Sequence, residues 1–194
     1  MLPLKFFQHN DVVHLAQELI GCILVRKTTT GVIKARITET EAYRHYDDLA
    51  CHAANSHRTP RNFPMFEKGG RTYVYLCYGI HNLMNIVTNK KDKADAVLIR
   101  AVEPIKGLSI ILRNRNHDQI QVSTTAGPGN LTKALSITRE LNNQPLNNPQ
   151  LFVEEKQGSP KLVASTRIGI GYAGSDELLP WRFYDASTKF ITRR

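Results

Sequence analysis

The chain has 194 residues, and its 26 lysines and arginines outweigh 17 acidic residues to give a formal net charge of +9. This excess favours a polyanionic partner, with nucleic acid the leading candidate; the alternative is a soluble basic or ribosome-associated protein. No apolar run reaches about 18 residues and no signal-peptide pattern occurs, so we expect no membrane partner and a cytoplasmic protein, nucleoid-associated if bacterial. The length and the lack of a linker predict a single domain over residues 1–194.

Motifs for metals and cofactors are missing from the sequence. Cys22, Cys51 and Cys77 are odd in number and form no C-x-x-C pair, which argues against disulfides and sulfur-rich zinc sites and favours a reducing compartment. The histidines lack the H-E-x-x-H and zinc-deaminase spacings, and no P-loop or dinucleotide fingerprint is present. We therefore expect neither a metal nor a cofactor.

The first elements in chain order are a helix and a short strand. Apolar residues at helical spacing predict a helix over Asp11–Ile20, with Asp11 as its N-cap and Gly21 as its stop. Cys22–Val25 is typical of a short buried strand, and a turn then leads into a long strand.

The long strand is predicted over Val32–Tyr43 and carries two carboxylates. Strand alternation places Glu39, Glu41 and Tyr43 on one side, in line with Ile33, Ala35 and Ile37. A buried carboxylate is costly unless it is paired, so Glu39 and Glu41 are candidates for ion pairs or for chemistry. The opposite side is expected to be the wetter one and holds Val32, Lys34, Arg36, Thr38 and Thr40.

The middle of the chain predicts a hairpin followed by a buried strand. The expected elements are a short helix over Asp47–Ala54, a basic loop over His57–Asn62, strands Thr72–Tyr78 and Leu83–Thr88 turning at Gly79, a strand over Ala96–Val102, and a helix from Pro104 to about Arg113. The buried strand contains Arg100, whose guanidinium needs a carboxylate or a ligand phosphate beside it.

The last third of the chain predicts a turn, a helix and two strands. Gly127–Asn130 is expected to form a turn that leads into a helix capped by Asn130, with Lys133 in the first turn of the helix. This helix start either holds a phosphate or is an ordinary cap. Arg167–Gly174 is expected to be a close-packed strand, and Pro180–Tyr184 a final edge strand.

The two glutamates allow a rival hypothesis. Two residues' rise along a strand separates Glu39 and Glu41 by roughly 6.6 Å, which resembles the carboxylate pair of an inverting glycoside hydrolase. A sugar substrate, however, does not call for nine surplus positive charges. A nucleic-acid enzyme is therefore favoured over a glycoside hydrolase and over a non-catalytic nucleic-acid-binding module.

The order of several motifs resembles the alkyladenine (3-methyladenine) DNA glycosylase family. The motifs are Arg36–Tyr43, His52, Thr59–Asn62, Tyr73–Tyr75 with Tyr78–Gly79 and Asn85, Leu98–Pro104, Gly127–Gly129 and Arg167–Gly174. The resemblance implies an α+β fold in a single compact domain, with a mixed or antiparallel curved sheet, flanking helices and a protruding β-hairpin. It also implies a monomeric, monofunctional hydrolase without a cofactor that excises damaged purines from duplex DNA.

The resemblance further implies roles for individual residues. Glu41 matches the general base and Arg100 an arginine that orients the attacking water. Tyr43, His52 and Tyr75 match the pocket that sandwiches the extruded base, and Asn85 the position that discriminates against guanine.

The expected DNA contacts come from three parts of the chain. Tyr78 matches the residue that wedges into the duplex, and Ile80 stands where some relatives carry a methionine. Arg61, Asn130 and Lys133 complete these contacts. Glu39 matches no chemical role, and we expect it to pair with an arginine or to cap a backbone group.

Overall fold

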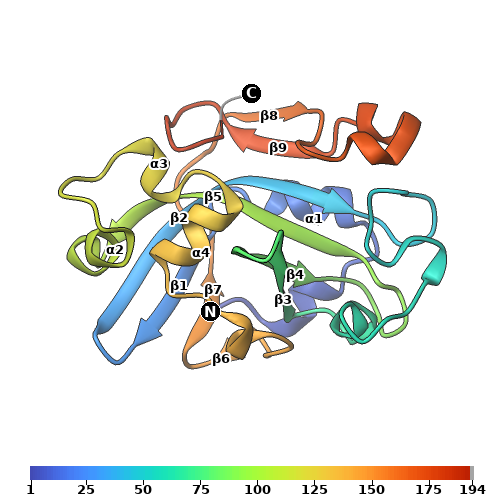
Figure 1. The fold of residues 1–194 in the computed structure, drawn as a ribbon, viewed down its shortest axis with the longest axis horizontal. Coiled ribbons are helices and arrows are strands. Elements are labelled where there is room, and N and C mark those ends of the chain that lie inside the picture. The colour runs from blue at the N-terminus through green and yellow to red at the C-terminus, as the bar shows by residue number, and fades with distance from the viewer. Residues whose placement is uncertain (193–194) are drawn as a thin grey trace.

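A long strand, β2 (Gly31–Tyr43), lies at the centre of the sheet in a computed structural model that describes residues 1–192 (Figure 1). Within those residues, nine strands form one curled sheet in which every pair is antiparallel, in the order β3-β4-β5-β2-β1-β7-β6, with β9 joining β2 to β8. The other strands are β1 (Ile23–Thr28), β3 (Arg71–Cys77), β4 (His81–Val87), β5 (Ala96–Lys106), β6 (Asn147–Asn148), β7 (Leu151–Glu154), β8 (Leu162–Ser165) and β9 (Arg182–Asp185). The α+β fold expected from the resemblance is confirmed.

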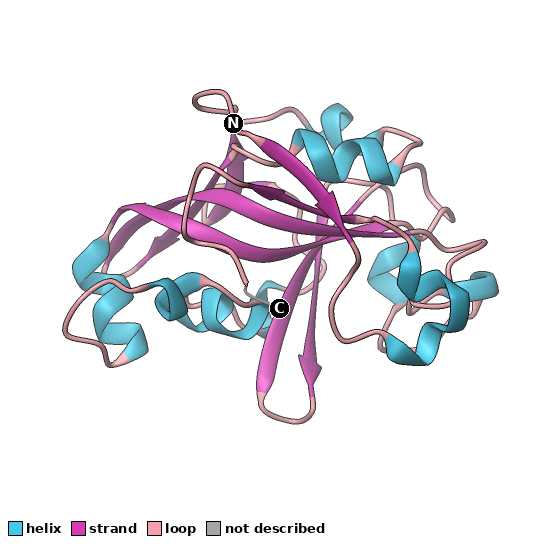
Figure 2. Cartoon of the chain, turned by 90° about the horizontal axis from the view of Figure 1, so that it is seen from above, coloured by secondary structure: helices cyan, strands magenta, loops and turns pink. Residues whose placement is uncertain are grey.

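Helices cover both faces of this sheet. The α-helices are α1 (Val12–Glu18), α2 (Leu108–Arg115), α3 (Val122–Thr125) and α4 (Pro128–Ala134). Short 3-10 helices are η1 (Leu4–Gln8), η2 (Ala54–Ser56), η3 (Phe63–Phe66), η4 (Arg139–Leu141) and η5 (Gly171–Leu178). Helix α1 lies on one face and α2, α3 and α4 on the other (Figures 1 and 2). No helix within residues 1–192 has the length and apolar character needed to cross a bilayer.

The length of β2 lets it join three neighbouring strands. Its first half pairs with β1, its second half pairs with β9, and β5 runs along its other edge. Glu41 therefore lies opposite Leu98 on one side and Arg182 on the other. The catalytic candidates of β2 are surrounded by backbone on both sides.

One face of β2 departs from the sequence prediction. Thr38 and Thr40 were expected on the wetter side, yet both are fully buried. Helix α1 covers Thr40, whose hydroxyl donates a hydrogen bond of 2.8 Å to the Ala16 carbonyl. The Thr38 hydroxyl donates to the Phe190 carbonyl at 2.6 Å. Both hydroxyls are satisfied, so burial costs little.

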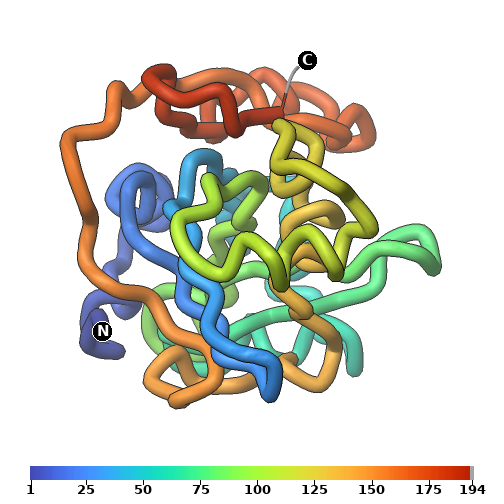
Figure 3. Tube along the Cα trace, turned by 90° about the vertical axis from the view of Figure 1, so that its left-hand side faces the viewer, coloured from blue at the N-terminus to red at the C-terminus, as the bar shows by residue number. Residues whose placement is uncertain are grey.

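The predicted hairpin is present and projects from the body of the protein. Strands β3 and β4 pair from Arg71↔Val87 to Cys77↔His81, and their turn stands clear of the other elements (Figures 2 and 3). Tyr78 and Gly79 both have positive φ, of 49° and 73°. Left-handed conformations at both central positions match the twist of a two-stranded ribbon, which explains the glycine.

Two helix predictions are wrong because local chemistry favours other structures. Pro104 lies inside β5 opposite Ala35, at a register irregularity, and the helix begins only after Gly107, whose φ is +81°. Residues 47–53 form turns instead of an α-helix, because the Asp48 carboxylate accepts backbone N–H groups from Arg44 and Ala50. Asp11, in contrast, caps α1 as expected.

The predictions for the last third need three corrections. Helix α4 begins at Pro128 after Gly127, so Asn130 lies inside the helix and Lys133 in its last turn. Residues 167–170 form no strand, and Gly171–Leu178 is the 3-10 helix η5. Strand β9 is not an edge strand, because it pairs with both β2 and β8.

Candidate active site

The two glutamates of β2 share one arginine of β5. The Arg100 Nε donates to Glu39 Oε1 at 3.1 Å, and its Nη1 donates to Glu41 Oε2 at 3.2 Å. Both carboxylates are fully buried and Arg100 is 6% exposed. Burial disfavours the charge of Arg100, but the Glu41 and Glu39 carboxylates outweigh it and raise the pKa of Arg100. The carboxylate partner that the sequence demanded for this cation is confirmed.

Glu41 is held by three donors. Besides Arg100, the Tyr43 hydroxyl donates to Oε2 at 2.8 Å and the Ile168 backbone N–H donates to Oε1 at 2.8 Å. Burial, and then the Glu41 carboxylate, raise the pKa of Tyr43 well above its ordinary value, so its hydroxyl stays a donor. A carboxylate has about four acceptor sites, so one on Oε1 is unused within residues 1–192.

A cavity of about 580 Å³ opens beside this network. Its wall includes eight of the expected site residues, namely Tyr43, His52, Arg61, Tyr75, Tyr78, Asn85, Arg100 and Asn130. Glu41 lies just behind the wall, in contact with Tyr43, Arg100 and Ile168, all of which line the cavity. These three groups therefore lie between the carboxylate and the cavity.

Aromatic rings form the side of the cavity nearest β3. The His52 ring lies 4.7 Å from the Tyr75 ring, and its Nδ1 lies 3.0 Å from the Tyr73 hydroxyl. His52 keeps contact with solvent, yet burial against these rings, and then the Arg61 guanidinium, lower the pKa of His52 to about 4. This imidazole is neutral at physiological pH, and the Arg61 guanidinium lies 4.9 Å from the centre of the Tyr75 ring.

The other expected DNA-contacting residues differ in how freely their side chains can reach DNA. Tyr78 and Ile80, at the hairpin tip, are 89% and 72% exposed. The Asn130 side chain is tied within the protein, because it donates to the Ala126 carbonyl and accepts from Arg115. Lys133 is exposed on α4 outside the cavity wall.

Comparison with known proteins gives the context for this geometry. The profile of the methylpurine-DNA glycosylase (MPG) family matches residues 5–189. The chain belongs to this family. A Chlamydia felis protein provisionally named 3-methyladenine DNA glycosylase is 46% identical over 188 residues, 94% of this chain and 95% of its own. A Methanocella arvoryzae protein with the same provisional name is 43% identical over 195 residues, 100% of this chain and 96% of its own.

Family membership settles the reaction class. The protein is a DNA glycosylase, a hydrolase acting on N-glycosyl bonds, and DNA is its substrate. This sets aside the glycoside hydrolase and the non-catalytic binding module. Within residues 1–192, no group of three or more His, Cys, Asp or Glu side chains is placed to hold a metal ion.

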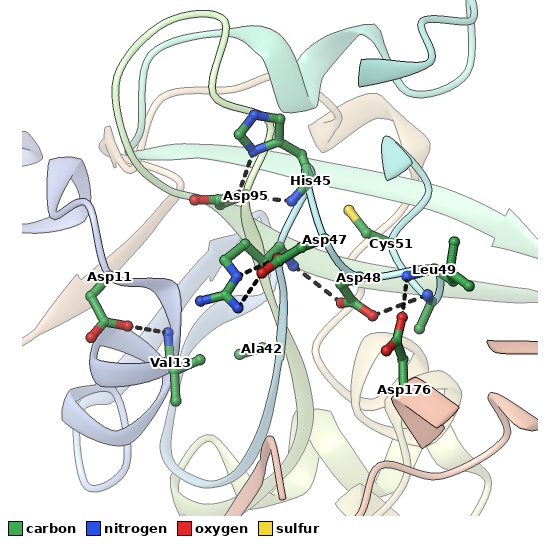
Figure 4. A network of polar contacts seen from close by, with 12 residues as sticks. Asp11, Val13, Ala42, His45, Asp47, Asp48, Leu49, Cys51, Asp95 and Asp176 are labelled. Carbon is green, nitrogen blue, oxygen red and sulfur yellow. Dashed lines mark hydrogen bonds and ion pairs between the residues drawn. The ribbon is translucent and has the colours of Figure 1, made fainter. Parts of the chain in front are cut away.

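A second ionic network, the ion pair of Asp48 and Arg167, lies next to the glycosylase site. Asp48 and Arg167 form a fully buried ion pair with oxygen–nitrogen distances of 2.6 and 2.8 Å. In the same turn, shown in Figure 4, the Asp48 carboxylate accepts the Ala50 N–H and the Asp176 carboxylate accepts the Leu49 N–H. The Arg167 guanidinium lies 4.9 Å from the Tyr43 ring centre, so this pair fixes the loop that presents the Ile168 amide.

Three site groups were missed in the sequence. Tyr73 stands two residues before Tyr75 in the same strand, and the strand alternation that puts both on one face was enough to place Tyr73 in the cavity. Tyr172 lines the cavity although it is 68% exposed, and no motif marked it apart from its run of small residues. The Ile168 amide carries no signal in the sequence, because any residue but proline supplies a backbone N–H.

Proposed function

We propose that this DNA glycosylase excises alkylated or deaminated purines from duplex DNA, with Glu41 as general base. The substrates in view are 3-methyladenine, 7-methylguanine, hypoxanthine and ethenoadenine. The observation that carries the proposal is a fully buried carboxylate with one unused acceptor site, held by Arg100 and Tyr43 behind a ring-lined cavity.

The reaction follows from this geometry. The damaged nucleotide leaves the stack and enters the cavity between Tyr43, His52 and Tyr75, whose ring faces attract a cationic alkylated purine. A water bound to Glu41 loses a proton to the carboxylate, and its oxygen bonds to the anomeric carbon. The N-glycosyl bond breaks, its electron pair leaves with the base, and Arg100 steadies the water and the carboxylate.

Selectivity comes from the cavity wall and from the hairpin. The Asn85 amide donates to the Tyr73 carbonyl at 3.2 Å and its side chain lines the cavity, which supports a role in crowding the exocyclic amino group of guanine. Tyr78 inserts where the lesion was stacked, with Ile80 beside it in the minor groove. Arg61, Lys133 and Asn130 contribute to the DNA surface, which a monomer presents to one duplex.

The basic surface predicts how binding responds to salt. A net charge of +9 implies that several phosphates are neutralised when the duplex binds, and the counterions that they release make affinity fall steeply with salt. An affinity that does not change with salt would contradict a phosphate-contacting surface.

One incubation tests the proposed activity. The protein is mixed with a duplex that contains a single hypoxanthine, and alkaline cleavage then reveals abasic sites. We expect strand cleavage only at the hypoxanthine, and none in the matched undamaged duplex. Parallel duplexes with 7-methylguanine or ethenoadenine define the range of lesions. Failure on every damaged purine would refute the proposal.

A further inference from the structure

The Glu39 side chain accepts four hydrogen bonds within residues 1–192, and the reaction above gives it no role. Its Oε1 accepts hydrogen bonds from Arg100 Nε at 3.1 Å, from Arg182 Nη1 at 3.0 Å and from the Thr192 hydroxyl. Its Oε2 accepts the Thr192 backbone N–H at 2.6 Å. Like Glu41 it lies behind the cavity wall, but among residues 1–192 the only wall residue to which it bonds is Arg100.

The segment that carries Thr192 is fastened to β2 at two neighbouring points. The Phe190 carbonyl accepts the Thr38 hydroxyl at 2.6 Å, and Thr192 donates twice to Glu39. Phe190 is buried, which anchors the segment further. The segment thus holds both oxygens of the Glu39 carboxylate, including the Oε1 that Arg100 binds.

Arg100 depends on both carboxylates for its orientation. Its guanidinium is a rigid planar group that binds Glu39 through Nε and Glu41 through Nη1, so displacing either partner turns the whole plane. Its Nη2 has no partner within residues 1–192 and lies on a side chain that lines the cavity. The angle of this plane decides where Nη2 points.

We propose that Glu39 and Thr192 are positioning residues: Thr192 fixes Glu39, and Glu39 sets the orientation in which Arg100 supports Glu41 and the attacking water. The inference rests on the proposed function, since it assigns these residues to the same hydrolytic step. Neither residue reaches the cavity, so their effect falls on the rate of base release and not on the binding of lesion DNA.

The first test removes one hydroxyl and then restores it. Thr192→Val deletes the side-chain donor to Glu39, Thr192→Ser keeps it, and Thr138→Val makes the same change at an exposed hydroxyl whose only side-chain partner is Glu140. Single-turnover release of hypoxanthine is measured together with duplex affinity. We expect a loss on the order of 10-fold for Thr192→Val, since small displacements of catalytic groups are costly. Thr192→Ser and Thr138→Val should match the wild type.

The second test separates rate from binding in Glu39→Gln. We expect single-turnover base release to fall on the order of 100-fold. Affinity for lesion DNA should stay within a factor of about 2, as the cavity wall is intact. A residue that only stabilises the fold would lose rate and affinity together, in proportion to the unfolded fraction in urea.

Several outcomes would overturn the inference. These are an unchanged single-turnover rate in Thr192→Val, a loss that Thr192→Ser shares, a loss explained by the unfolded fraction in urea titrations, and a parallel loss of rate and DNA affinity. If wild-type protein releases base while Thr192→Val is fully active, the inference fails and the proposed function stands. If wild-type protein releases no damaged purine, the proposed function itself fails.

Discussion

The ionic network on β2 and β5 and the tip of the β3–β4 hairpin are built in opposite ways. Glu41 is fully buried and bound by three donors, whereas Tyr78 is 89% exposed at the end of a two-stranded ribbon. A charge used for chemistry gains strength from low dielectric and fixed partners. A ring that inserts into DNA inserts more readily when it makes few contacts with the protein, because those contacts must break first. Substitutions in the first region should therefore affect rate or folding, and those in the second should affect recognition alone.

The largest effect is expected at Glu41. Glu41→Gln keeps the shape of the side chain but removes the base, so the rate of base release should fall on the order of 10³-fold or more while lesion DNA still binds. Single-turnover cleavage and fluorescence anisotropy measure the two quantities. Glu155→Gln, the same change at an exposed glutamate, should leave both unchanged. Retained turnover in Glu41→Gln would remove Glu41 from the mechanism.

The next largest effect concerns folding. Arg167→Met leaves Asp48 buried without its cation, which should cost about 3–5 kcal/mol of unfolding free energy. Urea titration measures this loss. Adding Asp48→Asn should recover part of it, because the uncompensated charge is then gone. A variant as stable as wild type would show that water reaches Asp48 and solvates it.

A smaller effect is expected at the hairpin tip. Tyr78→Ala should reduce the preference for damaged over intact duplex roughly 10-fold, in line with the loss of one stacking contact. Its unfolding free energy should change by less than about 0.5 kcal/mol, since the ring packs against little of the protein. Competition binding measures the preference. Tyr46→Ala, at another exposed tyrosine, is the matched control, and equal losses in the two variants would contradict a wedge at Tyr78.

The smallest effect is a shift in titration at His52. Its pKa of about 4 lies below the ordinary 6.5, so the unfolded chain binds the proton more readily. His52 therefore favours the folded state above pH 6.5, and this contribution is lost as pH falls toward 4. Histidine NMR should give a midpoint near 4. Arg61→Ala should raise that midpoint, and a midpoint at the ordinary value would mean that the ring swings into solvent.

Sequence patterns anticipated the site better than they anticipated the connections around it. Strand alternation placed Glu39, Glu41 and Tyr43 on one side, and the contacts of all three with one another or with Arg100 bear this out. The sequence also predicted an anionic partner for Arg100, because burying an unpaired guanidinium in an apolar strand is energetically costly. Such local rules hold because neighbouring residues on a strand share one environment.

Several of the failures involve contact between segments far apart in the chain. The burial of Thr38 depends on Phe190, and the pairing of β9 with β2 joins residues about 140 positions apart. Asp48 prefers turns to a helix because Arg167 and two backbone amides compete for its oxygens. Single-sequence periodicity carries no information on these partners.

The pairing of β2 with β9 has a consequence for biosynthesis. The strand that carries Glu41 leaves the ribosome about 140 residues before Arg182, its neighbour in β9. At ordinary translation speeds this interval is on the order of 10 s, during which one edge of the strand has no permanent neighbour. Ribosome-bound fragments that stop short of β9 are thus exposed to mispairing, and nascent chains can excise bases only after β9 has emerged and paired with β2.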